Sequence, residues 1–106
     1  MHWMVQDRKG RPVYLTQERW NHITARHPEL DSHLTDVLDT VRLGRRRQGK
    51  RDPNTYTYRR ACPRLPVPYN LIVVAVVFRW QESPDSETVP NNFVVSAWGK
   101  CVPSME

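Results

Sequence analysis

Histidine, arginine and hydroxyl side chains, which have the chemistry of phosphodiester cleavage, occur at separate places in the chain. His22 and His27 stand five residues apart, Arg59 and Arg60 end a β-branched and aromatic segment, and Ser96 lies near the C-terminus. Histidine titrates near neutral pH, so two of them can act as general base and general acid. Arginine can stabilise charge that develops on a phosphate. This set would suit cleavage of RNA through its 2′-hydroxyl without a metal ion.

The segment that carries both histidines has the signals of a short helix over residues 16–27. Thr16 can accept a backbone N–H as N-cap, and Pro28 ends the helix because proline disfavours the helical conformation in the residue before it. At about 100° per residue, His22 and His27 point about 140° apart. Both can therefore act at one site only if the helix unwinds before Pro28.

The two histidines have different neighbours on such a helix. His22 shares a face with Arg19 and Arg26, which favours His22 as the acid–base group if the helix stays regular. His27 shares the apolar face of Trp20, which we predict to be a core residue. His27 is then either a packed side chain that fixes the proline turn or, if the helix ends near a cleft, a catalytic one.

Other chemistries find less support in the sequence. No two of the possible metal ligands lie at i, i+4 on one predicted helix, which is the spacing of a zinc-protease helix. These possible ligands are His22, His27, Glu29 and His33. Neither a Gly-x-Ser-x-Gly nucleophile sequence nor a glycine-rich phosphate loop occurs. Cys62 and Cys101 both flank predicted strands, and we expect them to stay reduced. We expect no metal and no cofactor.

Positive charge is concentrated between residues 42 and 64. The chain carries a net charge of +5, and Asp52 is the only acid in this basic segment. Such a segment favours a polyanionic partner, although it can also be a solvated basic edge without one. We predict RNA contacts by its side chains, with one tyrosine as a stacking platform: Arg45, Arg46, Arg47, Lys50, Arg51 and Tyr58.

Hydrophobic periodicity predicts two helices between short strands. We expect a hairpin over 1–15, helices over 16–27 and from 31 or 32 to 43, a basic strand or loop over 45–51, strands over 55–60, 69–80 and 93–98, a mobile polar loop over 81–92, and a tail over 99–106. Gly44 stands where a C′ glycine ends the second helix, whose Asp36 and Asp39 we expect to face solvent.

Strands and helices are segregated along the chain, which predicts an α+β fold. We expect two helices packed on one face of a mainly antiparallel sheet of about four strands, within a single domain over 1–106. Residues 69–80 are apolar on both faces, so this strand should be central, and we expect it to pair antiparallel with 93–98.

The composition favours a small soluble domain. At 39% hydrophobic and 25% charged residues, the 106-residue chain can bury a core. Its N-terminus lacks the apolar stretch of a signal peptide, and its longest apolar run is too short to cross a bilayer. We therefore expect a cytoplasmic protein that does not bind membranes.

Several of these segments together resemble a known nuclease superfamily. They are Trp20-Asn21-His22-Ile23, Arg26-His27-Pro28-Glu29, Tyr56-Thr57-Tyr58-Arg59 and Val94-Val95-Ser96-Ala97-Trp98. The chain resembles the phage-type branch of the barnase–EndoU–colicin–RelE superfamily over residues 14–100. It departs from that pattern where Ser96 and Trp98 replace a threonine and a tyrosine, and in the length of segment 81–92.

The resemblance implies a RelE-like sheet with an RNA-binding face. It implies RNA as substrate, free or on the ribosome, and a toxin held inactive by an antitoxin or immunity protein. Two other functions stay open. One is a catalytically inactive module of the same fold that binds nucleic acid or protein, and the other is a phage or mobile-element accessory domain that acts by interaction alone.

Overall fold

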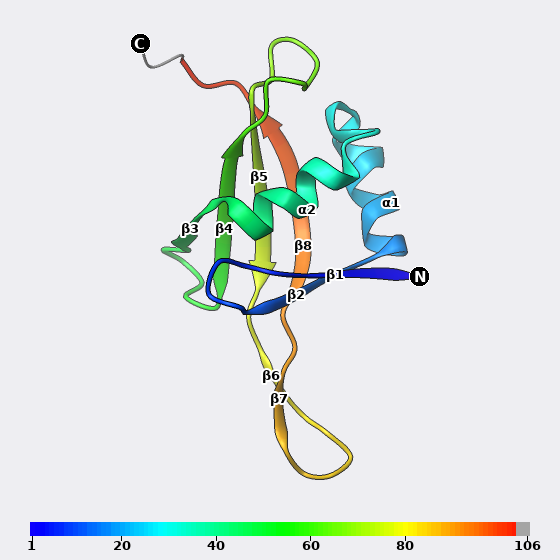
Figure 1. Ribbon diagram of the computed structural model, residues 1–106, viewed down its shortest axis with the longest axis vertical. Helices are drawn as coiled ribbons and strands as arrows, with labels where there is room; N and C mark the ends of the chain where they lie inside the picture. The colour runs from blue at the N-terminus through cyan, green and yellow to red at the C-terminus, as the bar shows by residue number, and fades with distance from the viewer. Residues whose placement is uncertain (104–106) are drawn as a thin grey trace.

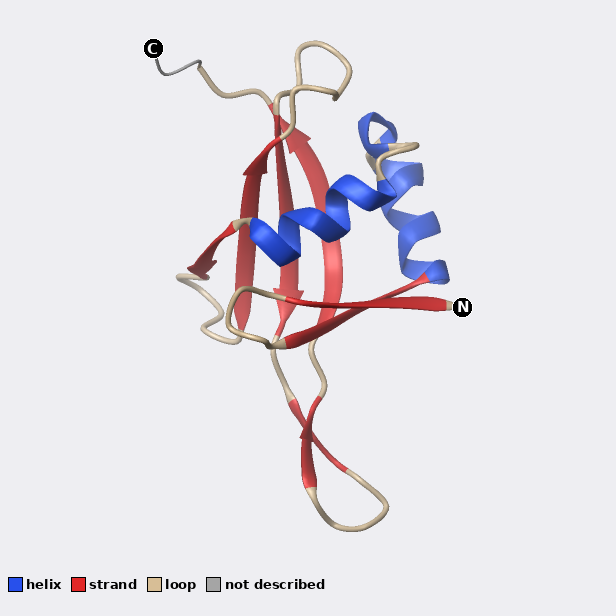
Figure 2. Ribbon diagram, in the orientation of Figure 1, coloured by secondary structure: helices blue, strands red, loops and turns tan. Residues whose placement is uncertain are grey.

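The computed structural model describes residues 1–103 and has an α+β fold (Figure 1, Figure 2). Two helices pack on a mixed sheet of six strands, and a two-stranded hairpin projects from it. The elements are β1 (His2–Gln6), β2 (Pro12–Thr16), α1 (Gln17–Arg26), the 3-10 turn η1 (Pro28–Leu30), α2 (Leu34–Leu43), β3 (Arg45–Gln48), β4 (Thr55–Ala61), β5 (Leu71–Val77), β6 (Trp80–Glu82), β7 (Thr88–Pro90) and β8 (Phe93–Lys100).

The sheet has the strand order β1-β2-β8-β5-β4-β3. β5 lies between β4 and β8 and is antiparallel to both, which confirms the predicted central strand and its pairing. The strand is shorter than the predicted 69–80, because it ends at Val77 and Trp80 begins β6. The sheet is larger than the four strands expected, because both strands of the N-terminal hairpin, β1 and β2, join it. It is also mixed, since β2 runs parallel to β8 through the single pair Tyr14↔Phe93.

Both helices lie on one face of the sheet, as predicted, and α2 crosses in front of β4, β5 and β8 (Figure 2). Every second residue of β5 joins the core on this side, through Ile72, Val74 and Val76. Trp20, 9% exposed, joins the same core from α1. The N-terminal hairpin closes the core just below α2 in the view of Figure 1, through Val13 and Leu15 of β2.

The start of α2 differs from the sequence prediction. A 3-10 turn over residues 28–30 precedes the helix, which begins at Leu34 without a side-chain cap from His33. Asp36 is buried at 5% exposure instead of facing solvent, because His33 and Arg64 both bond its carboxylate. Asp39 is partly exposed and pairs with Arg42.

Gly44 ends α2 for a reason other than the one predicted. Its φ of −75° is open to any residue, so no left-handed C′ conformation is involved. A Cβ atom at this position would lie 2.3 Å from the Thr40 carbonyl oxygen and 2.7 Å from that of Arg59. Glycine is required here because the last turn of α2 and the backbone of β4 both crowd this position.

Two further segments depart from the prediction. The polar segment 81–92 is mostly a hairpin, β6–β7, that extends away from the body (Figure 1), and the antiparallel pairs Trp80↔Pro90, Gln81↔Val89 and Glu82↔Thr88 hold it. The last strand continues to Lys100, so the tail predicted from residue 99 starts later; residues 104–106 lie outside the described part of the chain. Within residues 1–103, no helix is both long and apolar enough to cross a membrane.

Candidate nucleic-acid interface

The alternation of side chains along β4 separates the two faces of the sheet. Tyr58 points into the core under the helices and is 1% exposed. Its neighbours Thr57 and Arg59 therefore point to the opposite face, which neither helix covers. Arg60 follows on the helix side again, so only one of the two predicted arginines lies on the helix-free face.

Strand register arranges the helix-free face in two rows. One row runs across β3, β4, β5 and β8 as Arg45, Arg59, Val73 and Trp98; the other runs as Arg47, Thr57, Ala75 and Ser96. A bulge at Val95 in β8 keeps Ser96 opposite Ala75 in the second row. Three of the eight side chains are arginines and none is acidic.

The middle of this face is buried although no helix lies over it. Val73 is 1% exposed and Ala75 7%. The long side chains that flank Val73 in its row are Arg59 and Trp98, and we infer that they cover it. The Nε atom of Arg59 is buried and has no hydrogen-bond partner within residues 1–103. A ligand oxygen could satisfy this orphaned guanidinium N–H once the Arg59 side chain moves off Val73.

His27 lies beside this face, next to Trp98. α1 ends at Arg26, and His27 is its C-cap, with φ −128° and ψ 71° outside helical values. The imidazole is one-third exposed, and its centroid lies 6.4 Å from the Trp98 ring. His27 is therefore neither a fully packed core residue nor remote from the sheet.

Glu29 connects His27 to the edge of β8. Its Oε2 accepts the backbone N–H of Gly99 at 2.8 Å and lies 3.6 Å from His27 Nδ1. A Cβ atom on Gly99 would come within 2.8 Å of the Glu29 side chain, so glycine makes room for this contact. β2 pairs with β8 only at Phe93, so it does not reach the backbone of β8 at Gly99. The Glu29 carboxylate supplies the hydrogen-bond acceptor there instead. The same carboxylate can hold a protonated imidazole in place.

His22 lies elsewhere on the surface. It is exposed on α1 and lines a depression of about 280 Å³ with Thr16, Glu18 and Arg19. The structure thus keeps the two histidines apart, which is what the helical geometry predicted. It places His27, not His22, beside the arginine rows.

Arg46 belongs to the helix-side face, because it alternates with Arg45 and Arg47. Its guanidinium lies 3.3 Å from the centroid of the Tyr56 ring and 4.5 Å from that of Phe78, as cation–π pairs. These residues line a cleft of about 410 Å³. Lys50 and Arg51 are exposed in the β3–β4 turn.

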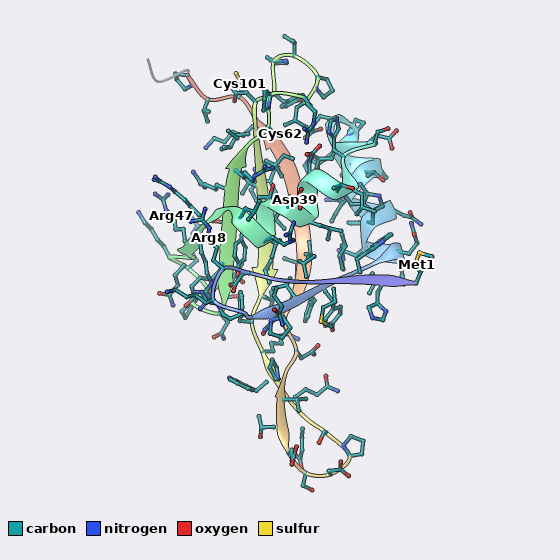
Figure 3. All side chains as sticks on the ribbon, viewed as in Figure 1. Met1, Arg8, Asp39, Arg47, Cys62 and Cys101 are labelled. Atoms are coloured by element: carbon teal, nitrogen blue, oxygen red, sulfur yellow. The ribbon has the colours of Figure 1, made fainter. Side chains whose placement is uncertain are left out.

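The flank beside β3 extends the positive charge of the arginine rows. Figure 3 shows Arg47 and Arg8 on the same flank of the molecule. Arg8 and Arg45 line a common depression of about 320 Å³ there. The predicted basic segment therefore divides between the helix-free face, the cleft and this flank.

Tyr58 requires a correction, because a side chain at 1% exposure offers no ring for a base to stack on. Its hydroxyl donates a 2.6 Å hydrogen bond to Asp7 Oδ2, which also pairs with Arg11 at 2.8 Å. Burial first, and then the bond to Asp7, raise the pKa of Tyr58 to about 12. We remove Tyr58 from the RNA contacts and assign it to the anchoring of the N-terminal hairpin.

Sequence reasoning missed two residues of this site. Trp98 entered the sequence analysis only as part of the last strand and of the family pattern, and Glu29 only as a possible metal ligand and as part of the motif around His27. Alternation from Arg59 would have placed Trp98 correctly once the strand register was known. The Glu29–Gly99 contact joins positions 70 residues apart, and no local pattern predicts it.

Comparisons of the chain with models of protein families, with curated proteins and with solved structures found no match. The assignment of a function therefore depends on the geometry of the site and on the resemblance in sequence.

Proposed function

We propose that this protein binds RNA on the helix-free face of its sheet and cleaves it there without a metal ion. The observation that carries the proposal is the arginine row that ends at His27: Arg45, Arg59, Val73 and Trp98, with the imidazole 6.4 Å beyond the indole. Two strand spacings, about 10 Å, separate the backbones of Arg59 and Trp98. The long Arg59 side chain would reach along the row, so that its guanidinium and the His27 imidazole meet the same phosphodiester.

Each side chain has a role that its chemistry allows. Arg59 binds the scissile phosphate and stabilises the charge that develops on it. His27, held by the Glu29 carboxylate, takes the proton from the 2′-hydroxyl, which then attacks phosphorus. The 5′-oxygen leaves and takes a proton from solvent, and Ser96 can donate a hydrogen bond to the bound strand. The reaction would leave 2′,3′-cyclic phosphate and 5′-hydroxyl ends.

The sequence resemblance adds a proposal about biological context. We infer a RelE-like nuclease of the barnase–EndoU–colicin–RelE superfamily that acts as a toxin on free or ribosome-bound RNA. An antitoxin or immunity protein that covers the arginine rows would hold it inactive, and an acidic surface would suit that role. Growth arrest on expression of the wild type, relieved by Arg59→Ala, would support this context.

A matched pair of arginine variants tests the cleavage site. Purified protein is incubated with total RNA, with and without EDTA, and the fragment ends are mapped. Arg59→Ala should lower cleavage by about 10²–10³-fold, the usual cost of a lost charge-stabilising donor, whereas Arg60→Ala on the opposite face should stay near wild type. Cleavage that EDTA abolishes, or that depends on Arg60 instead, would contradict the proposal. Binding without any cleavage would favour the inactive-module alternative.

A further inference from the structure

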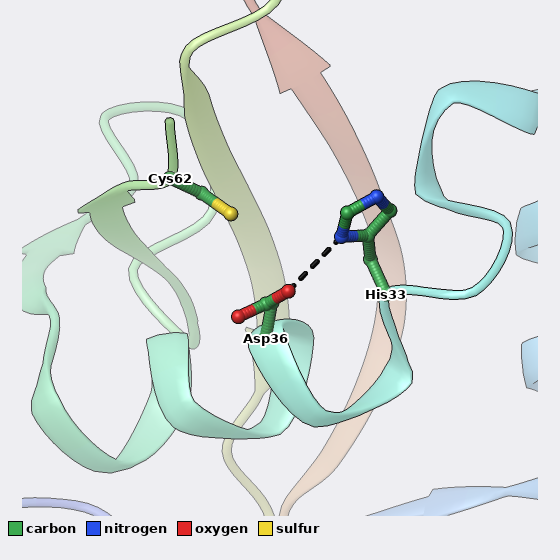
Figure 4. Close-up of side chains that lie close together, drawn as sticks. All are labelled: His33, Asp36 and Cys62. Carbon is green, nitrogen blue, oxygen red and sulfur yellow. Dashed lines mark hydrogen bonds and ion pairs between the residues drawn. The ribbon is translucent and has the colours of Figure 1, made fainter. Parts of the chain in front are cut away.

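We propose that His33, Asp36 and Cys62 form a binding site for a divalent transition-metal ion, with zinc as the best chemical match. The three side chains converge on the helix side of the sheet (Figure 4). They include none of the residues assigned to RNA cleavage, and the proposal is independent of that reaction.

The three donor atoms are already close to one another. His33 is the N-cap of α2, Asp36 lies in its first turn, and Cys62 follows the end of β4. The His33 nitrogen, an Asp36 carboxylate oxygen and the Cys62 sulfur all lie within 4.8 Å of one another, and His33 Nδ1 is 3.0 Å from Asp36 Oδ2. Zinc bonds of about 2.0–2.3 Å in tetrahedral geometry would place such atoms about 3.3–3.7 Å apart. The His33–Asp36 pair would open slightly and the Cys62 sulfur would move in by up to about 1 Å.

The donor types select the class of metal. Imidazole nitrogen, carboxylate oxygen and thiolate sulfur together suit zinc and its neighbours, whereas magnesium and calcium prefer oxygen ligands only. Asp36 is 5% exposed and Cys62 is 2% exposed, so an ion would sit beneath the surface. The His33 side chain is 15% exposed, which leaves the fourth position open toward water.

Arg64 supplies the positive charge at this site in the structure. Its guanidinium donates to Asp36 Oδ1 while His33 bonds Oδ2. Burial acts to raise the pKa of Asp36, but the hydrogen bonds from His33 and Arg64 outweigh it and lower that pKa. The Arg64 side chain is 70% exposed, so it can swing into solvent without unpacking the core. A metal ion and Arg64 would therefore compete for one carboxylate.

A structural role alone would also explain some of these contacts. A buried free cysteine is often an ordinary core residue, and Cys62 contributes to the core cluster. The competition with Arg64 separates the two accounts, since removal of Arg64 should improve metal binding only if the site binds metal.

Cobalt(II) is a suitable probe because cobalt–thiolate bonds absorb in the near ultraviolet. The full chain, kept reduced, is titrated with Co²⁺ and then with Zn²⁺. We expect one equivalent to give the thiolate band, Zn²⁺ to displace it, and a proton to be released as the thiol ionises. Cys62→Ser should abolish the band, while the exposed Cys101→Ser should keep it. His33→Ala should weaken binding at least about tenfold, and Arg64→Ala should tighten it severalfold.

Two results would overturn the proposal. One is a titration of the wild type without a thiolate band at one equivalent, or with a band that follows Cys101. The other is an Arg64→Ala variant whose metal affinity equals that of the wild type. The Arg64 result stands even if Cys62→Ser fails to fold, because Arg64 is exposed and its replacement leaves the core intact.

Discussion

At the scale of single residues, the hydrogen bond from Tyr58 to Asp7 anchors the N-terminal hairpin. Both residues are buried, and Arg11 completes the contact. From the sequence we predicted that Tyr58 contacts RNA, although a tyrosine in a strand is more often packed within the sheet. Which of the two alternating sets points inward depends on the helices, and the strand sequence alone does not decide it.

Tyr58→Phe should destabilise the protein by roughly 1–3 kcal/mol at neutral pH, because Asp7 loses a buried donor. The pKa of Tyr58 is raised from 10 to about 12, so its contribution is complete below pH 10 and is lost as pH rises toward 12. The difference between wild type and variant should therefore shrink over that interval. Urea unfolding at several pH values measures it, with Tyr56→Phe as the control. A difference that stays constant to pH 12 would contradict this account.

Trp20→Ala should cost roughly 3–5 kcal/mol, the usual result of emptying a large buried aromatic site. Trp20 is 9% exposed, whereas Trp80 on the projecting hairpin is 72% exposed. The same substitution at Trp80 should change the free energy of unfolding by less than about 0.5 kcal/mol. Equal effects at both positions in denaturant unfolding would show that the core is not organised as described.

At the scale of elements, the helices and the central strands were predictable because local signals agree with packing. Thr16 caps α1 by accepting the Arg19 N–H, and the apolar run of β5 lies at the centre of the sheet. The β6–β7 hairpin was missed since segment 81–92 is polar and has no glycine turn; Ser86 adopts the positive φ instead, at 63°. The parallel β2–β8 contact joins distant segments, which a local pattern cannot specify.

Gly44→Ala tests the close approach of α2 and β4. The added Cβ would lie 2.7 Å from the Arg59 carbonyl oxygen of β4 and would also meet that of Thr40 in α2 itself, so backbone must shift. We expect a loss of about 1–3 kcal/mol, typical of overpacking. Gly10→Ala is a partial control, because nothing lies within 4 Å of its Cβ and only its φ of +76° is unfavourable. A Gly44→Ala protein with the melting temperature of the wild type would contradict the proposed role of this glycine.

At the scale of the whole molecule, the candidate site was only partly predictable. The sequence supplied the basic segment and the motif around His27, but the division of the arginines between the two faces required the register of β3 and β4. The sequence also favoured His22 as the acid–base residue if the helix stayed regular. The early end of α1 and the contact with Glu29 instead place His27 beside the sheet.

The salt dependence of RNA affinity should come mainly from the arginines of the helix-free face. Arg45→Ala combined with Arg47→Ala should reduce the slope of log affinity against log salt by up to about 0.7 for each lost phosphate contact. Arg19→Ala combined with Arg26→Ala on α1 removes the same charge from another surface and should change the slope less. Fluorescence anisotropy with a short single-stranded RNA measures both. Equal slopes for the two double variants would mean that binding is not localised to the arginine rows.

The central claim is that His27 carries proton transfer at the end of the arginine row. The most direct measurement compares single-turnover RNA cleavage by His27→Ala and His22→Ala, with the fold of each checked by its melting curve. We predict that His27→Ala lowers the rate at least about a hundredfold, as for a lost general base, and that His22→Ala stays close to wild type. Full activity of folded His27→Ala, or a hundredfold loss in His22→Ala alone, would contradict the account.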